Sequence, residues 1–111
     1  MVAQTIFQQL RALTPASVFM SWGASKFQGF KENQIEGIGE FYLGGLMFYV
    51  RGIKHKGHVL VTLAGNDTYT VTIGHMKKAS IQPKKQFKNV YFDELPSVID
   101  EAIERQDNYQ Y

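Results

Sequence analysis

The sequence predicts an α+β fold, in which an antiparallel sheet of about four to six strands carries an N-terminal and a C-terminal helix. Three observations predict it. Apolar residues recur at helical spacing near both ends of the chain, the segments between them read as strands, and glycine-rich turns separate those segments. A chain of 111 residues, 44% of them hydrophobic, suits one core. We therefore expect a single domain over residues 1–106 and a short tail over residues 107–111.

The first helix is expected over residues 6–13. Its apolar residues share one stripe at helical spacing, namely Ile6, Leu10 and Leu13, with Phe7 beside them. The hydroxyl of Thr5 suits the N-cap position, where it accepts a hydrogen bond from the first turn. Pro15 lacks a backbone N–H and clashes with a preceding turn, so the helix is expected to end before it.

Strands are expected after this helix. Residues 18–22 predict a strand with Val18, Met20 and Trp22 on one face, and Gly23 allows a turn before residues 26–30. The single tryptophan is either a core residue or an exposed stacking or interface anchor, and its phase in the strand favours the core. The polar, glycine-rich residues that follow, 31–39, predict a loop.

The middle of the chain predicts a hairpin. Residues 40–51 are apolar on both faces, which is typical of a central strand covered on both sides or of two short strands bent at Gly44 and Gly45. We favour one strand with a glycine bend. A charged loop over residues 52–57 leads to a strand over residues 59–63, which pairs with it.

The next strand follows a turn signal at residues 65–67. Residues 68–73 alternate threonine with Tyr69, Val71 and Ile73, so we expect these three to face the core and the threonines to face outward. A basic connection over residues 75–88 is expected next. It contains a short strand at residues 79–82, before Pro83.

The last helix is expected to be capped by Asp93 and to tolerate Pro96 in its first turn. Its apolar residues have the spacing of a helix that lies on a sheet: Leu95, Val98, Ile99, Ala102 and Ile103. The acidic residues are therefore expected on its outer face: Glu94, Asp100, Glu101, Glu104 and Asp107.

Four segments carry short motifs. They are Gln8-Gln9-Leu10, Phe19-Met20-Ser21-Trp22-Gly23-Ala24-Ser25-Lys26-Phe27, the turn Asp67-Thr68-Tyr69, and Val90-Tyr91-Phe92-Asp93-Glu94-Leu95. Together they resemble a family of small, uncharacterised proteins of bacteriophages and other mobile elements. The chain departs from that family at Ser21-Trp22, where the family has threonine-glycine, and over residues 32–45, which have no clear counterpart. The resemblance implies a phage or prophage gene and no catalytic residues.

Several classes of function are not expected. The chain has no cysteine, which excludes disulfides, thiolate metal sites and cysteine nucleophiles. Residues 23–27 lack the second glycine of a nucleophile elbow, and residues 37–42 lack the last glycine of a dinucleotide-binding fingerprint. We therefore expect no enzymatic activity and no cofactor. Residues 1–5 do not read as a signal peptide and no apolar run reaches the ~20 residues of a membrane span, so we expect a cytoplasmic protein without a membrane partner.

The three histidines have two interpretations. His55, His58 and His75 could offer three imidazoles to a metal if the fold brought them together. Ordinary exposed histidines in a basic segment are the alternative. We favour the second interpretation and expect no metal site, because no acidic ligand accompanies them at a recognisable spacing.

Charge is segregated along the chain, although the net charge is only +2. Residues 1–50 are balanced, residues 51–90 carry eight lysines and arginines against Asp67, and residues 91–111 carry six carboxylates against Arg105. We expect one positive face and a separate negative face on the last helix, a layout that suits a charged partner.

The lysines of the basic segment are the candidate binding residues, because together they could neutralise phosphates: Lys54, Lys56, Lys77, Lys78, Lys84, Lys85 and Lys88. Phe87 and Tyr91 are interleaved with them and could stack on bases. Lysines of solvated loops, or lysines neutralised by the last helix, are the alternative. We expect contact with nucleic acid. A protein that inhibits or modulates a host protein, for example an anti-defence protein, is the second hypothesis. The oligomeric state stays open.

Overall fold

The structure is a computed structural model, and it describes residues 2–32, 35–39, 41–52, 55–78 and 80–103. Its elements in chain order are α1 (Val2–Leu13), α2 (Ala16–Ser21), β1 (Ser25–Lys31), β2 (Gly44–Arg51), β3 (Lys56–Leu63), β4 (Tyr69–Lys77), β5 (Ser80–Val90), the 3-10 helix η1 (Phe92–Glu94) and α3 (Leu95–Ile103). The five strands form one antiparallel sheet in the order β1-β2-β3-β4-β5. The predicted α+β fold, with a helix at each end of the sheet-forming segment, is confirmed.

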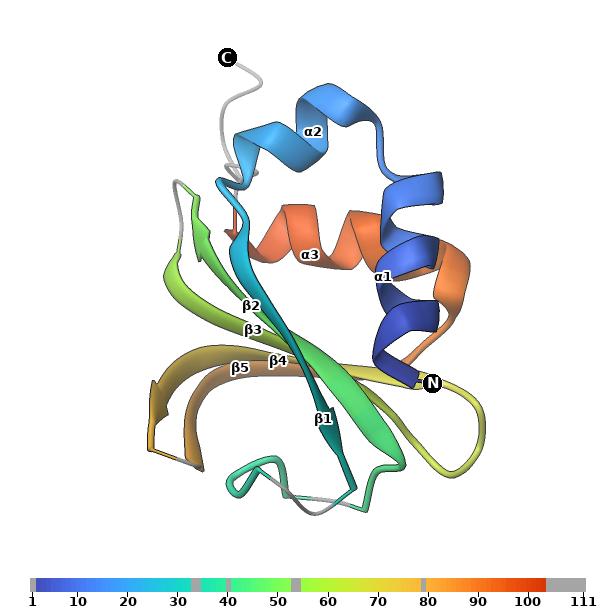
Figure 1. Cartoon of the computed structure of the whole chain (residues 1–111), viewed down its shortest axis with the longest axis vertical. Helices are drawn as coiled ribbons and strands as arrows, with labels where there is room; N and C mark the ends of the chain where they lie inside the picture. Colours follow the sequence, from blue (N-terminus) through green and yellow to red (C-terminus); the bar gives the residue numbers. More distant parts are fainter. Residues whose placement is uncertain (1, 33–34, 40, 53–54, 79, 104–111) are drawn as a thin grey trace.

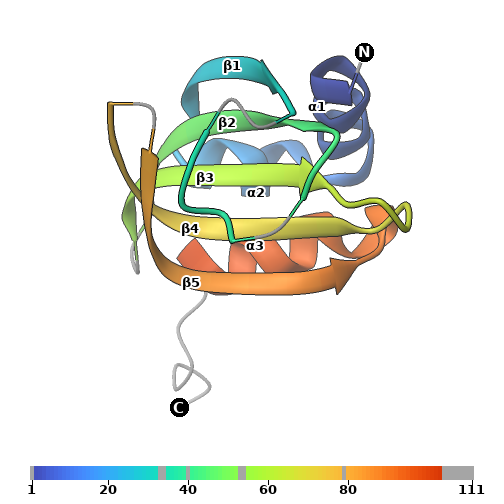
Figure 2. The same ribbon diagram turned by 90° about the horizontal axis from the view of Figure 1, so that it is seen from below.

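The two faces of the sheet are covered differently. The three α-helices lie on one face, and the segment between β1 and β2 crosses the other (Figures 1 and 2). We call these the helix face and the loop face. Within the described residues, no helix is long and apolar enough to cross a membrane.

The helix face is buried by α1 and α3. Apolar side chains of the two helices pack against alternate residues of β2, β3 and β4 and are fully or almost fully buried: Ile6, Leu10, Leu95, Ile99 and Ile103. The predicted pattern of the last helix is confirmed. The first helix is longer than predicted, because Ala3 extends its buried stripe by one turn, and Thr5 lies inside the helix instead of capping it.

Residues 18–22 are not a strand. Residues 16–21 form α2, and Pro15 precedes it with extended backbone angles that suit its fixed φ. Two of the three residues that predicted a strand, Val18 and Trp22, also share one side of a helix at spacing i and i+4, and Phe19 lies on that side with them. Accordingly, Val18 and Phe19 are partly buried, Trp22 is fully buried and Met20 is 77% exposed.

The two central hairpins have the predicted order. β2 pairs with β3 from Gly45↔Thr62 to Arg51↔Lys56. The strand predicted over residues 40–51 is too long: residues 41–43 are not strand, residue 40 lies outside the described residues, and β2 begins at Gly44. It is covered on both faces, as predicted: Phe48 lies in the core of the helix face, and Met47 packs against the core of the loop face.

Strand β4 confirms one half of its prediction and contradicts the other. Tyr69, Val71 and Ile73 face the helices. The threonines on the opposite side, Thr68, Thr70 and Thr72, are buried instead of exposed. The reason is the segment between β1 and β2, which covers the loop face with a second core made of Phe30, Ile35, Ile38, Tyr42, Leu60 and Ile81. Polar alternation alone does not predict which face a loop will cover.

Residues 75–77 and 80–88 are strand, not a connection. They belong to β4 and β5, which pair along most of their length, and β5 continues through Pro83. Pro83 is tolerated because β5 is an edge strand. The pairing shifts between Ile73 and Gly74, where a β-bulge lets the outer end of the hairpin curl away from the helices (Figure 1).

Three predictions for the last third of the chain concern an N-cap, a strand and the tail. The last helix is preceded by η1, whose N-cap is Tyr91 and not Asp93: the carboxylate of Glu94 accepts the Tyr91 N–H at 3.0 Å, and the Glu94 N–H returns to the Tyr91 carbonyl at 2.9 Å. The strand predicted at residues 79–82 begins at Ser80 in the structure, and residue 79 lies outside the described residues. The predicted tail over residues 107–111 also lies outside them.

Candidate nucleic-acid interface

Strand β5 and its hairpin turn position most of the predicted lysines. Lys84, Lys85 and Lys88 lie on β5, an edge strand of the sheet, and Lys77 and Lys78 lie where β4 turns into it. All five side chains are exposed. We call these five residues the lysine edge. Lys56 is exposed at the start of β3, and Lys54 lies outside the described residues.

The lysine edge spreads over both sides of the sheet margin. Lys85 pairs with Ile73 and so points to the helix side, together with Phe87, which pairs with Val71. Lys88 borders a hollow on the loop side that also involves Thr70. Because β5 carries lysines on both its sides, a polyanion that followed this edge would meet a cation from either direction.

No described acidic residue belongs to these strands, although the exposed Glu36 pairs with Ser80 at the start of β5. β3, β4 and β5 contain no aspartate or glutamate, and Asp67 lies in the turn between β3 and β4. The acidic residues of the last segment lie elsewhere: Asp93 and Glu94 belong to η1, and Asp100 and Glu101 to α3, on the helix face. Asp100 is half-buried and accepts the Trp22 Nε1–H at 3.0 Å, so it is not part of an exposed acidic face. Glu104 and Asp107 lie outside the described residues.

The predicted stacking residues are separated by the structure. Phe87 is partly buried against the core of the helix face, and its stacking on bases stays a prediction. Tyr91 is 61% exposed directly after the end of β5. Three further exposed aromatic side chains among the described residues were not predicted: Phe27, 36% exposed, Phe41, 56% exposed, and Phe92, 52% exposed. Nothing in the sequence around Phe41 distinguishes it from the apolar strand that follows.

The single tryptophan is a core residue, as its sequence phase favoured, although a helix and not a strand delivers it. Its ring lies 5.5 Å from the ring of Phe19, centre to centre, and its indole N–H is bonded to Asp100. This hydrogen bond joins the end of α2 to α3 and satisfies the only polar atom of a fully buried side chain.

The histidines approach one another without forming a ligand set. The ring of His75 lies 5.4 Å from that of His55, and the ring of His58 lies 5.3 Å from that of Tyr49. Nδ1 of His58 accepts the Met76 N–H at 3.3 Å, while Nε2 of the buried His55 has no hydrogen-bond partner among the described residues. The part of the chain that the structure describes holds no group of three histidine or acidic side chains arranged for a metal ion.

The environment of two of these histidines favours the neutral form. Burial lowers the pKa of His55 below its usual 6.5, and the positive charges of Lys84 and His75 lower it further. Burial also lowers the pKa of His58, together with the charges of His75 and Lys26. Both rings therefore act as neutral packing groups near neutral pH and add no charge to the lysine edge.

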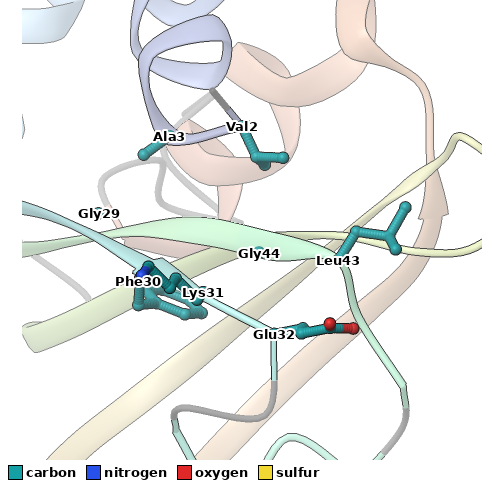
Figure 3. Close-up of a pocket in the computed structure, with 8 residues that line it drawn as sticks. All are labelled: Val2, Ala3, Gly29, Phe30, Lys31, Glu32, Leu43 and Gly44. Atoms are coloured by element: carbon teal, nitrogen blue, oxygen red, sulfur yellow. The ribbon is translucent and has the colours of Figure 1, made fainter.

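A larger pocket lies on the opposite margin of the sheet. It has a volume of about 650 Å³ and lies between the first turn of α1 and strands β1 and β2 (Figure 3). Apolar side chains, including Val2, Phe30 and Leu43, form most of its lining, and Lys31 and Glu32 supply its charged groups. It contains no hydroxyl, thiol or imidazole that could act as a nucleophile or base.

Comparisons with family models, with curated proteins and with solved structures found no match to this chain. The resemblance to small phage proteins therefore stays a prediction. What the chain can do has to be argued from its own residues.

Proposed function

We propose that this chain is a non-enzymatic protein that contacts nucleic acid through the lysine edge. The observation that supports the proposal is the composition of an edge strand. Eleven residues of β5 include three exposed lysines and no carboxylate, and the hairpin turn adds two more lysines. A line of cations without intervening acids neutralises phosphates in any sequence, because phosphates recur regularly along every nucleic acid.

Edge strands also carry charge for another reason. Lysines and bulges on an edge discourage pairing with other chains, and β5 has both. That structural role concerns residues on the edge strand itself. Lys77 and Lys78 lie in and beside the turn, where there is no edge to protect, so edge protection does not account for the whole set.

The test is binding of labelled single- and double-stranded oligonucleotides, followed by fluorescence anisotropy at ~50 mM salt, where phosphate contacts are strong. We expect measurable binding. The logarithm of the association constant should fall linearly with the logarithm of the salt concentration, with a slope of about −0.7 to −0.9 for each phosphate contacted. A protein that binds neither oligonucleotide under these conditions would end the proposal.

A matched pair of variants separates a specific edge from net charge. The first reverses four residues of the lysine edge to glutamate: Lys77, Lys78, Lys84 and Lys85. The second reverses four cations elsewhere, which leaves the same net charge: Arg11, Lys26, Lys31 and Arg51. All eight side chains are exposed, so most reversals should change stability only slightly, by about 0.5 kcal/mol. Arg11 and Lys26 lie over aromatic rings, so the second variant should lose somewhat more stability than the first. We expect the first variant to lose binding and the second to retain most of it. Equal loss in both would mean that only overall charge matters.

A protein partner is the second candidate, and strand β1 is the observation that favours it. β1 is the other edge of the sheet, and six of its seven residues are exposed. An extended segment of a host protein could pair with such an edge. This candidate predicts recovery of one host protein in stoichiometric amount from a lysate, and failure to recover any would count heavily against it.

The setting of the gene belongs to the same proposal. The short motifs around residues 20–26, 67–69 and 90–95 resemble those of phage proteins and suggest a phage or prophage gene. We therefore expect neighbouring genes of phage replication, virion assembly or anti-defence. Neighbours drawn only from ordinary bacterial metabolism would contradict this setting, without bearing on the binding experiment.

A further inference from the structure

A hollow lies beside the lysine edge on the loop face. Its volume is about 250 Å³, and its lining brings together three parts of the chain that are far apart in sequence. Phe41 comes from the segment before β2, Asn66 from the turn between β3 and β4, and Lys88 and Asn89 from the end of β5. The hollow therefore combines an aromatic ring, two amides and a cation.

A β-bulge turns two of these residues toward the hollow. Phe87 pairs with Val71 and Val90 pairs with Tyr69, so Lys88 and Asn89 together face the single residue Thr70. Asn89 has a φ of +57°, a left-handed conformation that asparagine tolerates better than most residues. Bulges of this kind commonly re-aim side chains beside functional sites. The strain is local, and the pairing of β4 with β5 resumes at Val90.

The other polar group is held in place by its own turn. Oδ1 of Asn66 accepts both the Thr68 N–H, at 3.3 Å, and the Thr68 hydroxyl, at 2.7 Å. The amide Nδ2 is then the group of Asn66 that can donate to a ligand. The turn itself is closed by the Ala64 N–H donating to the Thr68 carbonyl at 2.8 Å. A donor fixed in this way loses little freedom when it binds.

We propose that this hollow receives one unpaired base of a single-stranded nucleic acid, an inference that rests on the proposed function. Phe41 stacks on the face of the base, Asn66 and Asn89 hydrogen-bond to its edge, and Lys88 neutralises a neighbouring phosphate. Every base has a flat face that can stack, and the edge of an unpaired base carries donors and acceptors that amides match. The volume corresponds to about eight water molecules. A pyrimidine ring with its two exocyclic oxygens has as many non-hydrogen atoms as the hollow has room for water molecules.

The geometry favours a single strand over a duplex. In a duplex the faces of each base are stacked and its pairing edge is occupied, so neither Phe41 nor the asparagines could reach them. Phosphates, in contrast, are available in both forms. The lysine edge alone would bind both, and the hollow adds affinity only for the single strand.

The experiment compares three labelled probes of equal length: an oligothymidylate, the same strand with abasic sites, and a duplex. Phe41→Ala is the test variant, since this exposed side chain contributes little to the core, and Phe92→Ala is the matched control, because Phe92 is similarly exposed outside the hollow. We expect Phe41→Ala to weaken binding of the oligothymidylate by roughly five-fold to a hundred-fold and to leave the other two probes unchanged. Phe92→Ala should bind all three as the unmodified chain does.

A second variant tests the hydrogen bonds without disturbing the bulge. Asn89→Gly keeps the left-handed backbone, which glycine adopts without strain, and removes the amide. We expect it to bind oligothymidylate and oligoadenylate with more similar affinities than the unmodified chain does.

The outcomes separate the two proposals. If the unmodified chain binds none of the probes, both proposals fail. If it binds, but Phe41→Ala binds the oligothymidylate as tightly as the unmodified chain, the base site is wrong and the phosphate-binding function stands. If Phe41→Ala weakens all three probes equally, the ring supports the lysine edge and does not stack on a base, which also overturns the base site.

Discussion

The two faces of the sheet are buried by different kinds of structure. On the helix face, α1 and α3 supply side chains such as Leu10 and Ile99 at regular helical spacing. On the loop face, Ile35, Ile38 and Tyr42 come from an irregular segment. A helix satisfies its own backbone hydrogen bonds, whereas an irregular segment must find partners elsewhere.

Several hydrogen-bond partners of the irregular segment are identifiable among the described residues. The Ile81 N–H donates to the Glu36 carbonyl at 2.8 Å, and Gln86 Nε2 donates to the Ile38 carbonyl at 2.7 Å. The Tyr42 hydroxyl accepts the N–H of Ile35 and donates to its carbonyl, both at 2.8 Å. The loop face therefore adds single tertiary hydrogen bonds to its smaller apolar core, whereas the helix face is held by repeated apolar contacts. The comparison implies that the two faces differ in how they respond to substitution.

Removing an equally buried isoleucine from each face should show the largest difference. Ile99 is 0% exposed on the helix face and Ile81 is 1% exposed on the loop face. Substitution of such residues by alanine costs about 2–5 kcal/mol, with more where the surroundings cannot collapse. We expect Ile99→Ala near the top of this range and Ile81→Ala near the bottom, because the irregular segment can move into the space. Urea unfolding followed by Trp22 fluorescence measures both. An equal or greater cost for Ile81→Ala would contradict the comparison.

Two glycines of the irregular segment test how closely it is held. Gly37 and Gly39 both have positive φ, +98° and +87°, so alanine strains the backbone at either position by about 1 kcal/mol. At Gly37 a Cβ would lie 2.1 Å from the Ile81 carbonyl oxygen, while at Gly39 nothing lies within 4 Å. We expect Gly37→Ala to destabilise the protein more and to speed amide exchange at Ile81. Exchange at Ile81 that is equally fast in both variants would mean that the segment is not held there.

The helix face could be predicted from the sequence because its signals are local. The spacing of Leu95, Ile99 and Ile103 identifies a helix and its inner side without knowledge of the sheet. The alternation of residues 68–73 likewise identified β4 and its helix-facing side chains. The error at α2 has a local cause too, since five residues are too few to distinguish a strand from a helical turn.

The loop face could not be predicted in the same way, because its burial depends on contacts between distant residues. Thr70 and Thr72 have the sequence pattern of solvent-facing residues but are buried. The segment between β1 and β2 crosses this face of the sheet (Figure 2). The candidate site shows the same division. The lysines were predicted by composition, whereas the hollow beside Lys88 depends on a bulge at Asn89 and on Phe41, which is distant in sequence.

Removal of one tyrosine hydroxyl from each face gives a smaller difference. Tyr42→Phe leaves a buried N–H and a carbonyl of Ile35 without partners, which costs about 1–3 kcal/mol. The Tyr69 hydroxyl donates to Gln9 Oε1 at 2.8 Å, and Gln9 is only partly buried, so Tyr69→Phe should cost about 0.5–1.5 kcal/mol. Urea midpoints measure both costs. A costlier Tyr69→Phe would reverse the comparison.

Acidification should act on the loop face alone. His58 lies on the same side of β3 as Leu60, and the core of the helix face contains no described histidine. The pKa values of His55 and His58 are lowered from 6.5 by burial, so the unfolded chain takes up protons first as the pH falls. The free energy of unfolding should therefore decrease as the pH falls through the unfolded-state pKa of 6.5 and on toward the lower pKa values of the folded state.

Protonation of His58 also removes one specific hydrogen bond, so the effect of acid can be measured at a single amide. Neutral His58 accepts the Met76 N–H at Nδ1, and a protonated ring cannot accept it. After correction for the intrinsic exchange rate, the Met76 amide should open more easily at about pH 5 than at about pH 8, while the Ile99 amide on the helix face should change only as much as global stability does. His75→Gln provides a control. It removes one charge that lowers the pKa values of His55 and His58, so it should weaken the pH dependence of stability without abolishing it. If the Met76 and Ile99 amides respond equally to pH, the two faces unfold as one unit. They then differ only in the contacts that build them.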